Sequence, residues 1–313
     1  MKLKQGFKSR IKELSKDKRD YKRFLSIIKQ KPPKAIRCNT LKIKPKKLKE
    51  RLEGKGWKIK QIDKETFKIR NNLNPGELGK SREHLLGYYY IQSVVSQLPI
   101  KALNPKPGEL VLDLAAAPGS KTTHCCQYME NKGTIIANDK DGFRTKNMGF
   151  NLDRCGCMNV IATNHNGTDL NKKLRKIGVK FDKIILDMPC SAEGTSRSKP
   201  EILEKWNEDK IDKFNRMQTR LAESAIDLLK SSGSLIYSTC TFAPEENEKV
   251  VSNLIDNFDL EIEKISLPLK TREGITEWEG QKYNKEVKKA TRVYPQDNNT
   301  EGFFLAKLKK NVT

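Results

Sequence analysis

The chain has 313 residues, of which 36% are apolar and 32% are charged, and its formal net charge is +23. This balance is typical of a globular protein with a sizeable core, and it excludes a disordered chain. No apolar run approaches the roughly 20 residues of a membrane-spanning helix, and the lysine-rich N-terminus lacks the apolar segment of a secretory signal. We therefore expect a cytoplasmic protein with no membrane partner.

The positive charge is concentrated at the start of the chain. Residues 1–60 contain 23 Lys and Arg against 5 Asp and Glu. Such a field attracts polyanions at long range and makes affinity for them depend on salt. The alternative is a lysine-rich surface that only keeps the protein soluble. The asymmetry favours a nucleic-acid partner.

The first part of the chain predicts a basic helical extension (1–30) and a small α+β module (31–82). Apolar residues at helical spacing predict one helix over 7–30, which ends at Pro32-Pro33. A strand, a basic helix and two short strands are predicted next, over residues 35–43, 44–54, 58–62 and 66–69. The module lacks the aromatic pattern of base readers, so we expect it to contact phosphate and RNA shape. A turn-rich connector follows at 71–82.

From Gly108 onward, apolar runs alternate with helical stretches. The predicted strands are 110–114, 134–137, 160–162, 183–186, 235–237, 260–265 and 303–307. The predicted helices are 121–129, 144–155, 168–177, 205–229 and 244–257. This alternation predicts a mostly parallel, doubly wound α/β sheet within a domain over 83–313. The poorly patterned connection 266–299 suits an antiparallel edge strand after it.

The strand at 110–114 leads directly into a loop of small residues and a helix start. The loop residues are Ala115, Ala116, Ala117, Pro118, Gly119, Ser120, Lys121 and Thr122. Its single Gly fits neither GxGxxG nor the GxxxxGK[ST] phosphate loop. Asp113 before it can face ammonium and sulfonium charges, which favours S-adenosylmethionine. Asp139 follows the second strand, where ribose hydroxyls bind, and an amide in 163–166 can bond an adenine edge.

Two cysteines stand at the ends of two buried strands, in Asp187-Met188-Pro189-Cys190 and Ser238-Thr239-Cys240-Thr241. Enzymes that methylate exocyclic amines often have an aromatic residue at the last position of the first tetrapeptide. A thiol at that position, Cys190, favours a carbon target. A thiolate that adds to C6 of cytosine makes C5 nucleophilic. Protonated Asp187 would assist by bonding to N3, and Lys121 is the nearest candidate to stabilise the thiolate. The residues alone do not order the two thiols.

The other cysteines carry no catalytic pattern. Cys125, Cys126, Cys155 and Cys157 lack the paired CxxC spacing of a zinc site, and the total of seven cysteines is odd. We expect buried, reduced thiols and no metal.

These motifs resemble the RNA cytosine-C5 methyltransferases of the RsmB/NOL1/NOP2/Sun family. The resemblance spans roughly residues 35–309 and rests on 113–122, 187–195 and 237–248. Further signatures are Arg37–Leu41, Tyr90–Gln92 and Gly302–Phe304.

The resemblance implies a Rossmann-like class I S-adenosylmethionine methyltransferase sheet behind an RRM-like module. It implies cytosine in RNA as acceptor, most like archaeal enzymes acting on tRNA, with rRNA as the alternative. It also implies that Cys240 is the nucleophile and that Cys190 assists proton removal or product release. The implied donor contacts are Ala115–Lys121, Asp139, Arg144, Asn166 and Asp187.

Three positions depart from the family pattern. Ser120 replaces a Gly, which costs about 1 kcal/mol if its φ must be positive. Asn166 stands where an acidic residue is usual, and Ala192 replaces a Gly after Pro-Cys-Ser. An RNA-binding or assembly factor with a weakened donor site is therefore a second hypothesis.

Overall fold

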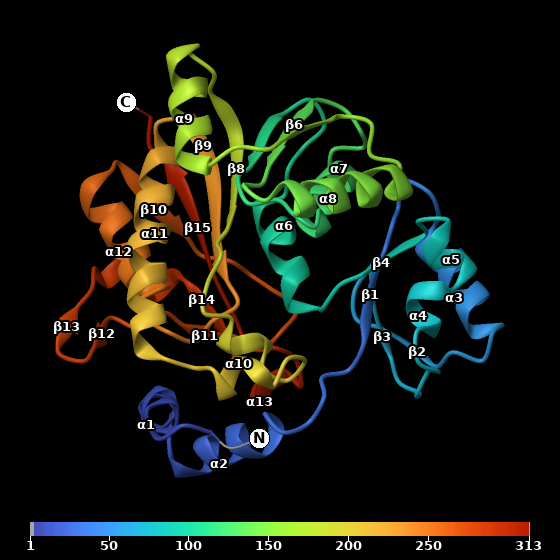
Figure 1. Ribbon diagram of the computed structural model, residues 1–313, viewed down its shortest axis with the longest axis horizontal. Coiled ribbons are helices and arrows are strands. Elements are labelled where there is room, and N and C mark those ends of the chain that lie inside the picture. Colours follow the sequence, from blue (N-terminus) through green and yellow to red (C-terminus); the bar gives the residue numbers. More distant parts are fainter. Residues whose placement is uncertain (1–2, 313) are drawn as a thin grey trace. The chain divides into compact units, whose positions relative to one another are not determined.

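The structure is a computed structural model that describes residues 3–312 (Figure 1). The chain forms two compact units. The first unit comprises the N-terminal residues up to Pro32, Met188–Glu223 and Tyr237–Lys309. The second unit comprises Pro33–Asp187, Ser224–Ile236 and the C-terminal residues from Lys310. The small-residue loop thus belongs to the second unit, and both cysteines of the strand-end motifs belong to the first.

A parallel sheet forms the centre of the second unit. Its strands are β5 (Leu110–Asp113), β6 (Thr134–Asn138), β7 (Val160–Thr163) and β8 (Phe181–Asp187). Strand β5 pairs in parallel with β6 and β8, and β6 pairs in parallel with β7. The start of β9 (Leu229–Thr239) lies beside β8. The predicted parallel α/β sheet is confirmed, and Asp113, Asn138 and Asp187 end strands at one edge.

Four helical segments connect these strands or precede them. They are α6 (Leu98–Leu103) with the short turn η1 (Val95–Gln97), α7 (Ser120–Tyr128), α8 (Gly142–Cys155) and α9 (Gly167–Lys176). Helix α8 begins where the Asp141 carboxylate accepts the Arg144 N–H, and it ends at Gly156 with φ 74°. Both are ordinary helix boundary signals, which explains why the sequence located this helix.

A small antiparallel sheet completes the second unit. It contains β1 (Ala35–Cys38), β2 (Ile59–Gln61), β3 (Thr66–Ile69) and β4 (Tyr89–Ile91), in the order β2-β3-β1-β4. Helix α3 (Pro45–Glu53) packs Leu48 and Leu52 into its apolar core. Short helices α4 (Glu77–Lys80) and α5 (Arg82–Leu85) precede β4. The β-α-β-β pattern is present, and pairing of β4 with β1 carries this sheet past residue 82.

Two predictions in this region were wrong in their extent. The strand expected over 35–43 ends at Cys38, because the Asn39 carbonyl accepts the N–H groups of Lys42 and Ile43 and the chain turns. The expected connector at 71–82 contains α4, which follows Gly76 with φ 78°.

Helices and short antiparallel strands build the first unit. The helices are α1 (Gln5–Leu14), α2 (Lys18–Ile27), η2 (Glu193–Thr195), α10 (Glu201–Glu204), α11 (Glu208–Ile226), α12 (Glu248–Asn257), η3 (Lys285–Lys289) and α13 (Pro295–Asn298). The strands are β10 (Leu260–Glu263), β11 (Arg272–Glu273), β12 (Glu277–Trp278), β13 (Gln281–Lys282), β14 (Thr291–Val293) and β15 (Phe303–Lys310). Strand β14 is antiparallel to β11 and β15.

Of two long predicted helices, one is divided and the other is shorter than expected. Asp17 accepts the Asp20 N–H and starts α2 afresh, so the segment 7–30 holds two helices. The segment 205–229 begins inside a turn after α10, and α11 starts at Glu208. The segment 266–299, which showed little pattern, contains β11 to β14, each of two or three residues.

The basic N-terminal extension is part of the core of the first unit. Phe7, Ile11 and Phe24 pack with Trp206 and Phe242 in one buried apolar cluster. Ion pairs reinforce it, with Arg10 bound to Glu245 at 2.5 Å and Arg272 bound to Asp20 at 2.7 Å. The apolar residues whose spacing predicted helical structure here are therefore also the residues that pack the N-terminal extension against the rest of the first unit.

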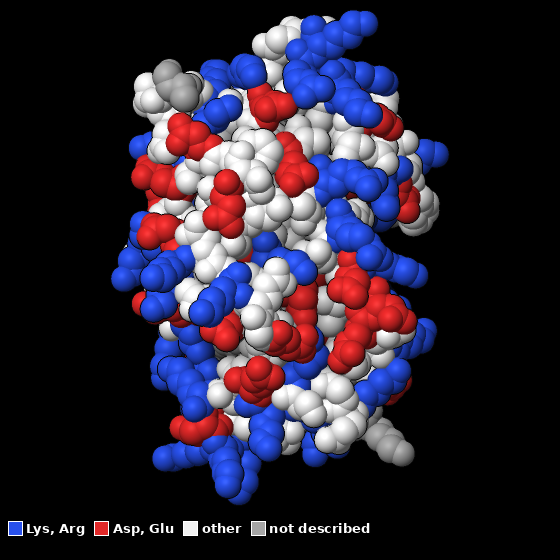
Figure 2. Space-filling model, turned by 90° about the vertical axis from the view of Figure 1, so that its left-hand side faces the viewer, with Lys and Arg blue, Asp and Glu red and all other residues white. Residues whose placement is uncertain are grey.

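Lysine and arginine side chains are widespread on the face drawn in Figure 2, with acidic side chains among them. Within residues 3–312, no helix has both the length and the apolar composition that crossing a membrane requires.

Candidate functional site

Asp113 ends β5 and is buried beneath the small-residue loop of the second unit. One of its carboxylate oxygens accepts a hydrogen bond from the Thr122 hydroxyl at 2.7 Å. The other, Oδ1, has no hydrogen-bond partner among the described residues. Burial raises the pKa of Asp113 to about 7. An unpartnered buried oxygen of this kind suits a ligand that brings a donor or a positive charge.

The loop between β5 and α7 approaches α8 closely at the helix start. Gly119 has φ 93° and caps α7, and a Cβ there would lie 3.1 Å from Met148 Cγ. Ser120 is the first residue of α7 and is not among the positive-φ residues. The conditional cost of Ser at this position therefore does not apply. The N-terminus of α7 carries the partial positive charge of a helix start, which attracts carboxylates.

Asp139 lies directly after β6 and joins this loop. Its carboxylate accepts the N–H groups of Ala117 at 3.2 Å and Asp141 at 3.0 Å. Arg144 lies 3.5 Å from it and also donates to the Ala117 carbonyl. The structure thus brings the predicted residues Ala117, Asp139 and Arg144 together.

Asn166 has a different local role from the other predicted donor residues. Its side-chain oxygen caps α9 by accepting the Thr168 N–H at 3.0 Å and the Thr168 hydroxyl at 2.8 Å. The loop before it is held by buried Asn138, which accepts the His165 N–H at 3.0 Å and donates to the His165 carbonyl at 3.0 Å. Sequence reasoning missed Asn138, although an Asn closing a buried strand is itself a signal.

Lys121 and Asp187 form an ion pair at the carboxyl edge of the parallel sheet. Their Nζ and Oδ2 atoms are 2.5 Å apart, and Lys121 also donates to the Ser96 hydroxyl at 3.2 Å. Lys121 is buried, whereas the Asp187 side chain is 30% exposed. The two residues that were predicted separately therefore act as one charged pair, with the carboxylate as its accessible end.

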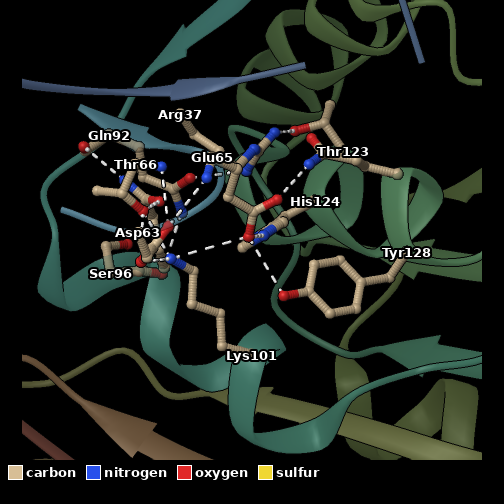
Figure 3. A network of polar contacts seen from close by, with 12 residues as sticks. Arg37, Asp63, Glu65, Thr66, Gln92, Ser96, Lys101, Thr123, His124 and Tyr128 are labelled. Atoms are coloured by element: carbon tan, nitrogen blue, oxygen red, sulfur yellow. Dashed lines mark hydrogen bonds and ion pairs between the residues drawn. The ribbon is translucent and has the colours of Figure 1, made fainter. Parts of the chain in front are cut away.

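Figure 3 shows a buried polar network behind the loop, in which Arg37 of β1 is central. Arg37 donates to the Ser120 carbonyl and to Gln92, both at 2.7 Å, and to the Thr123 hydroxyl at 2.8 Å. Glu65, directly before β3, is hydrogen-bonded to His124 at 3.0 Å. Burial, together with the charge of Arg37, lowers the pKa of His124 to about 3, so its ring is neutral at neutral pH. The small sheet therefore supports the first turn of α7.

Cys190 and Cys240 meet in the first unit. Their sulfur atoms are 3.2 Å apart and share a hydrogen bond. That hydrogen bond, with burial, raises the pKa of Cys190 well above its usual range. Cys190 is therefore the thiol that keeps its proton, and either sulfur can donate the hydrogen bond that the pair shares.

Glu246 is a buried carboxyl group beside the sulfur pair that sequence reasoning did not single out. It accepts the Ser191 N–H at 3.0 Å and the Gln218 side chain at 2.9 Å. Its second oxygen, Oε1, lacks a partner among the described residues. Burial raises the pKa of Glu246 to about 7. A carboxyl group with this pKa can hold or release a proton near neutral pH.

The loops that carry the two cysteines are held together by close backbone contacts. The Gly194 N–H donates to the Cys240 carbonyl at 2.8 Å, and Gly302 donates to the Gly194 carbonyl at 2.9 Å. A Cβ on Gly194 would lie 2.4 Å from the Gly302 oxygen, so neither the loop nor the start of β15 tolerates a side chain there. This contact explains why Gly302 belongs to the motif set.

The remaining predicted absences concern metal and disulfide chemistry. No group of three or more His, Cys, Asp or Glu with metal-binding geometry occurs in the part of the chain that the structure describes. All seven cysteines are free thiols, and Cys125, Cys126 and Cys155 are buried.

The chain matches two described protein families. Residues 100–309 match 16S rRNA methyltransferase RsmB/F. Residues 3–94 match the N-terminal domain of 16S rRNA methyltransferase RsmF.

Similar curated proteins and solved structures include archaeal and bacterial ones. The tRNA (cytosine(49)-C(5))-methyltransferase of Pyrococcus abyssi is 42% identical over 280 residues, which is 88% of each chain. Ribosomal RNA small subunit methyltransferase F of Vibrio campbellii is 36% identical over 90% of this chain, which spans 58% of that protein. A methyltransferase homologue from Pyrococcus horikoshii superposes with a TM-score of 0.83 and 37% identity, covering 95% of this chain and 92% of that one. NSun6 from the same organism, solved with SFG, gives a TM-score of 0.83 at 26% identity over 98% of both chains.

Proposed function

Because the chain belongs to the RsmB/F family of RNA methyltransferases, we propose that it methylates C5 of cytosine in tRNA through a covalent cysteine adduct. The class I methyltransferase fold expected from the sequence is confirmed by its structural neighbours. The observation that carries the adduct is the sulfur pair, with 3.2 Å between Cys190 and Cys240.

The methyl donor is S-adenosylmethionine, which supplies an electrophilic methyl group when bound. The unpartnered Asp113 oxygen and the positive end of the α7 dipole fit such a cationic, carboxylate-bearing molecule. Residues Ala115–Lys121 and Arg144 would hold it, with Asp139 at its ribose. Asn166 caps α9, so it would contribute through the position of its loop or through its amide nitrogen.

Cys240 is the proposed nucleophile. Its sulfur attacks C6 of cytosine, the ring electrons move toward N3, and C5 becomes the carbon that accepts the methyl group. Asp187 is ionised in its pair with Lys121, so it would first take a proton from the Lys121 ammonium and then donate it to N3. The raised pKa of Cys190 makes that thiol the poorer nucleophile of the two, which supports Cys240 in this role.

Cys190 and Glu246 are proposed to complete the reaction. After methyl transfer the C5 proton must leave and the C6–sulfur bond must break, so that the ring regains its double bond and Cys240 its thiolate. The Glu246 carboxylate, formed as pH approaches its pKa of about 7, would take the Cys190 proton, and the resulting Cys190 thiolate would accept the C5 proton.

Two relatives bear on the RNA substrate. Support for tRNA comes from the Pyrococcus abyssi protein, which this chain matches over 88% of both lengths. Ribosomal RNA is the second candidate, because the matching families are described by 16S rRNA and the Vibrio campbellii relative is named for it. The hypothesis of an inactive assembly factor rested in part on strain at Ser120. That part of the argument is removed, because Ser120 does not have a positive φ. A cytoplasmic location stays a prediction.

Substitution of each cysteine tests the mechanism. We expect Cys240→Ala to abolish methylation and Cys190→Ala to accumulate RNA covalently bound to protein, visible on denaturing gels. A covalent species formed by the Cys240→Ala variant would reverse the assignment. Bisulfite sequencing of total RNA from cells with and without the protein distinguishes tRNA from rRNA targets.

A further inference from the structure

A cavity of about 600 Å³ opens beside Cys190 within the first unit. Its inner wall includes Trp206, Phe214 and Met217, which are aromatic or apolar. Lys210 and Lys213 line it as well, and both are exposed. The lining thus combines apolar side chains with an excess of lysine, since Lys205 also lines it and Glu201 is the one acidic residue among its described lining residues. The cavity volume is within the range of about 300–1,000 Å³ of ligand sites.

We propose that this cavity binds the base of a nucleotide adjacent to the target cytosine, with Lys210 and Lys213 on its phosphates. The inference rests on the proposed function and adds a substrate subsite to it. Aromatic side chains replace base stacking in single-stranded recognition, and lysines follow the backbone.

The position of the cavity relative to the sulfur pair favours a neighbour over the target base. Cys190 lines the cavity, whereas Cys240 is not among its described lining residues. The target C6 must contact Cys240, and the two sulfur atoms are 3.2 Å apart. The cavity therefore lies on the Cys190 side of the reacting sulfur, within reach of a nucleotide next to the target.

Base flipping supplies the energetic reason for such a site. An enzyme that acts on a base in a folded RNA must take it out of the stack. The nucleotide next to it then loses a stacking partner on one face. A wall built from Phe214 and Met217 restores that contact and holds the strand while the target reacts.

The test combines a protein variant with a substrate change. The substrate is a synthetic RNA hairpin that contains the cytosine located by bisulfite sequencing, with each flanking nucleotide in turn made abasic. For the wild-type protein we expect one abasic position to raise KM about tenfold with little change in kcat. Phe214→Ala should raise KM similarly on intact RNA and show no further rise on that abasic RNA. Coupling of this kind indicates direct contact.

Two further variants keep the result interpretable. Phe214→Tyr retains the aromatic face and should restore the wild-type KM. Phe150→Ala removes an exposed aromatic side chain on α8 and should change neither parameter. If the KM increases caused by Phe214→Ala and by the abasic site multiply when both changes are present, the proposed subsite is wrong. An unchanged KM for Phe214→Ala on intact RNA would overturn it as well. Absence of methylation by the wild-type protein would instead refute the proposed function.

Discussion

Ala192 adopts the left-handed conformation, with φ 61°, two residues after Cys190. For a residue with a Cβ this conformation costs roughly 1–2 kcal/mol, whereas Gly adopts it without strain. Gly loses more chain entropy on folding, by roughly 0.5–1 kcal/mol. We therefore predict that Ala192→Gly raises the free energy of unfolding by up to about 1 kcal/mol, measured by thermal melting.

The matched control for this prediction is Ala102→Gly within α6. The helical backbone there gives Gly no advantage, so stability should fall by roughly 0.5–1 kcal/mol. A fall of the same size for Ala192→Gly would mean that position 192 is not strained.

Glu246 makes stability depend on pH in a direction opposite to most carboxyl groups. Its pKa is about 7 in the folded protein and 4.5 as an ordinary Glu. As pH rises from about 4.5 to 7, the unfolded chain releases this proton and the folded chain keeps it, so stability falls. The free energy of unfolding falls by on the order of 3 kcal/mol over this range, since each unit of pKa difference corresponds to about 1.4 kcal/mol.

We predict that Glu246→Gln flattens this fall, because the amide stays neutral at every pH. Unfolding by urea at several pH values between 4.5 and 7 measures the slope. Glu204→Gln changes an exposed Glu of α10 and should leave the slope as in the wild type. Equal slopes in the wild type and in Glu246→Gln would contradict the prediction.

Some site residues could be predicted from sequence and others could not. Cys190, Cys240 and the loop Ala115–Lys121 follow strand ends, a position that local pattern identifies. Glu246 and Arg37 owe their properties to partners 28 to 83 positions away in the chain, such as Gln218 and Ser120. Periodicity carries no information about such contacts.

At the scale of elements, the link from β1 to α7 makes Arg37 a positioning residue. Its guanidinium contacts Ser120 and Thr123 together with Gln92, a geometry that a single ammonium group cannot reproduce. We predict that Arg37→Lys raises the Kd for S-adenosylmethionine about tenfold, measured by calorimetry, and changes RNA affinity much less.

Arg51→Lys provides the matched control on the same small sheet and helix module. Arg51 pairs with Glu83 at 3.1 Å and its side chain is 44% exposed, so the substitution should leave donor affinity unchanged. A lower melting temperature for Arg37→Lys with normal donor affinity would restrict Arg37 to a role in folding.

Element boundaries explain where the predicted fold differs from the observed one. Long apolar runs and helical spacing located β5 to β8 and α7 to α9. The predicted helix 7–30 is interrupted by a turn that leaves the apolar period almost intact, so periodicity did not detect the break. The predicted helix 205–229 is continuous but shorter, as α11 over Glu208–Ile226. Strands of two or three residues, such as β11 and β12, are too short to show alternation.

At the scale of the whole molecule, the positively charged residues fall into two groups, those in buried ion pairs and those exposed to solvent. In the first unit, Arg10 forms an ion pair with Glu245, and Arg272 forms one with Asp20. The N-terminal helices pack there through apolar residues. The lysines in α3 and directly before it differ from these arginines, because Lys44, Lys46 and Lys47 are exposed. These are the cations that we expect to meet RNA phosphates.

We predict that Lys44, Lys46 and Lys47, all changed to Gln, weaken RNA binding and lower the salt slope of log K by about 2–3. Each phosphate contact contributes about 0.7–0.9 to that slope through counterion release. The same three-charge change at Lys172, Lys173 and Lys176 of α9, which are also exposed, controls for net charge. Binding of labelled tRNA at 50 to 200 mM salt measures both variants. Equal slopes for the two would mean that RNA responds to total charge, and an unchanged slope for the first would assign the α3 lysines to solubility.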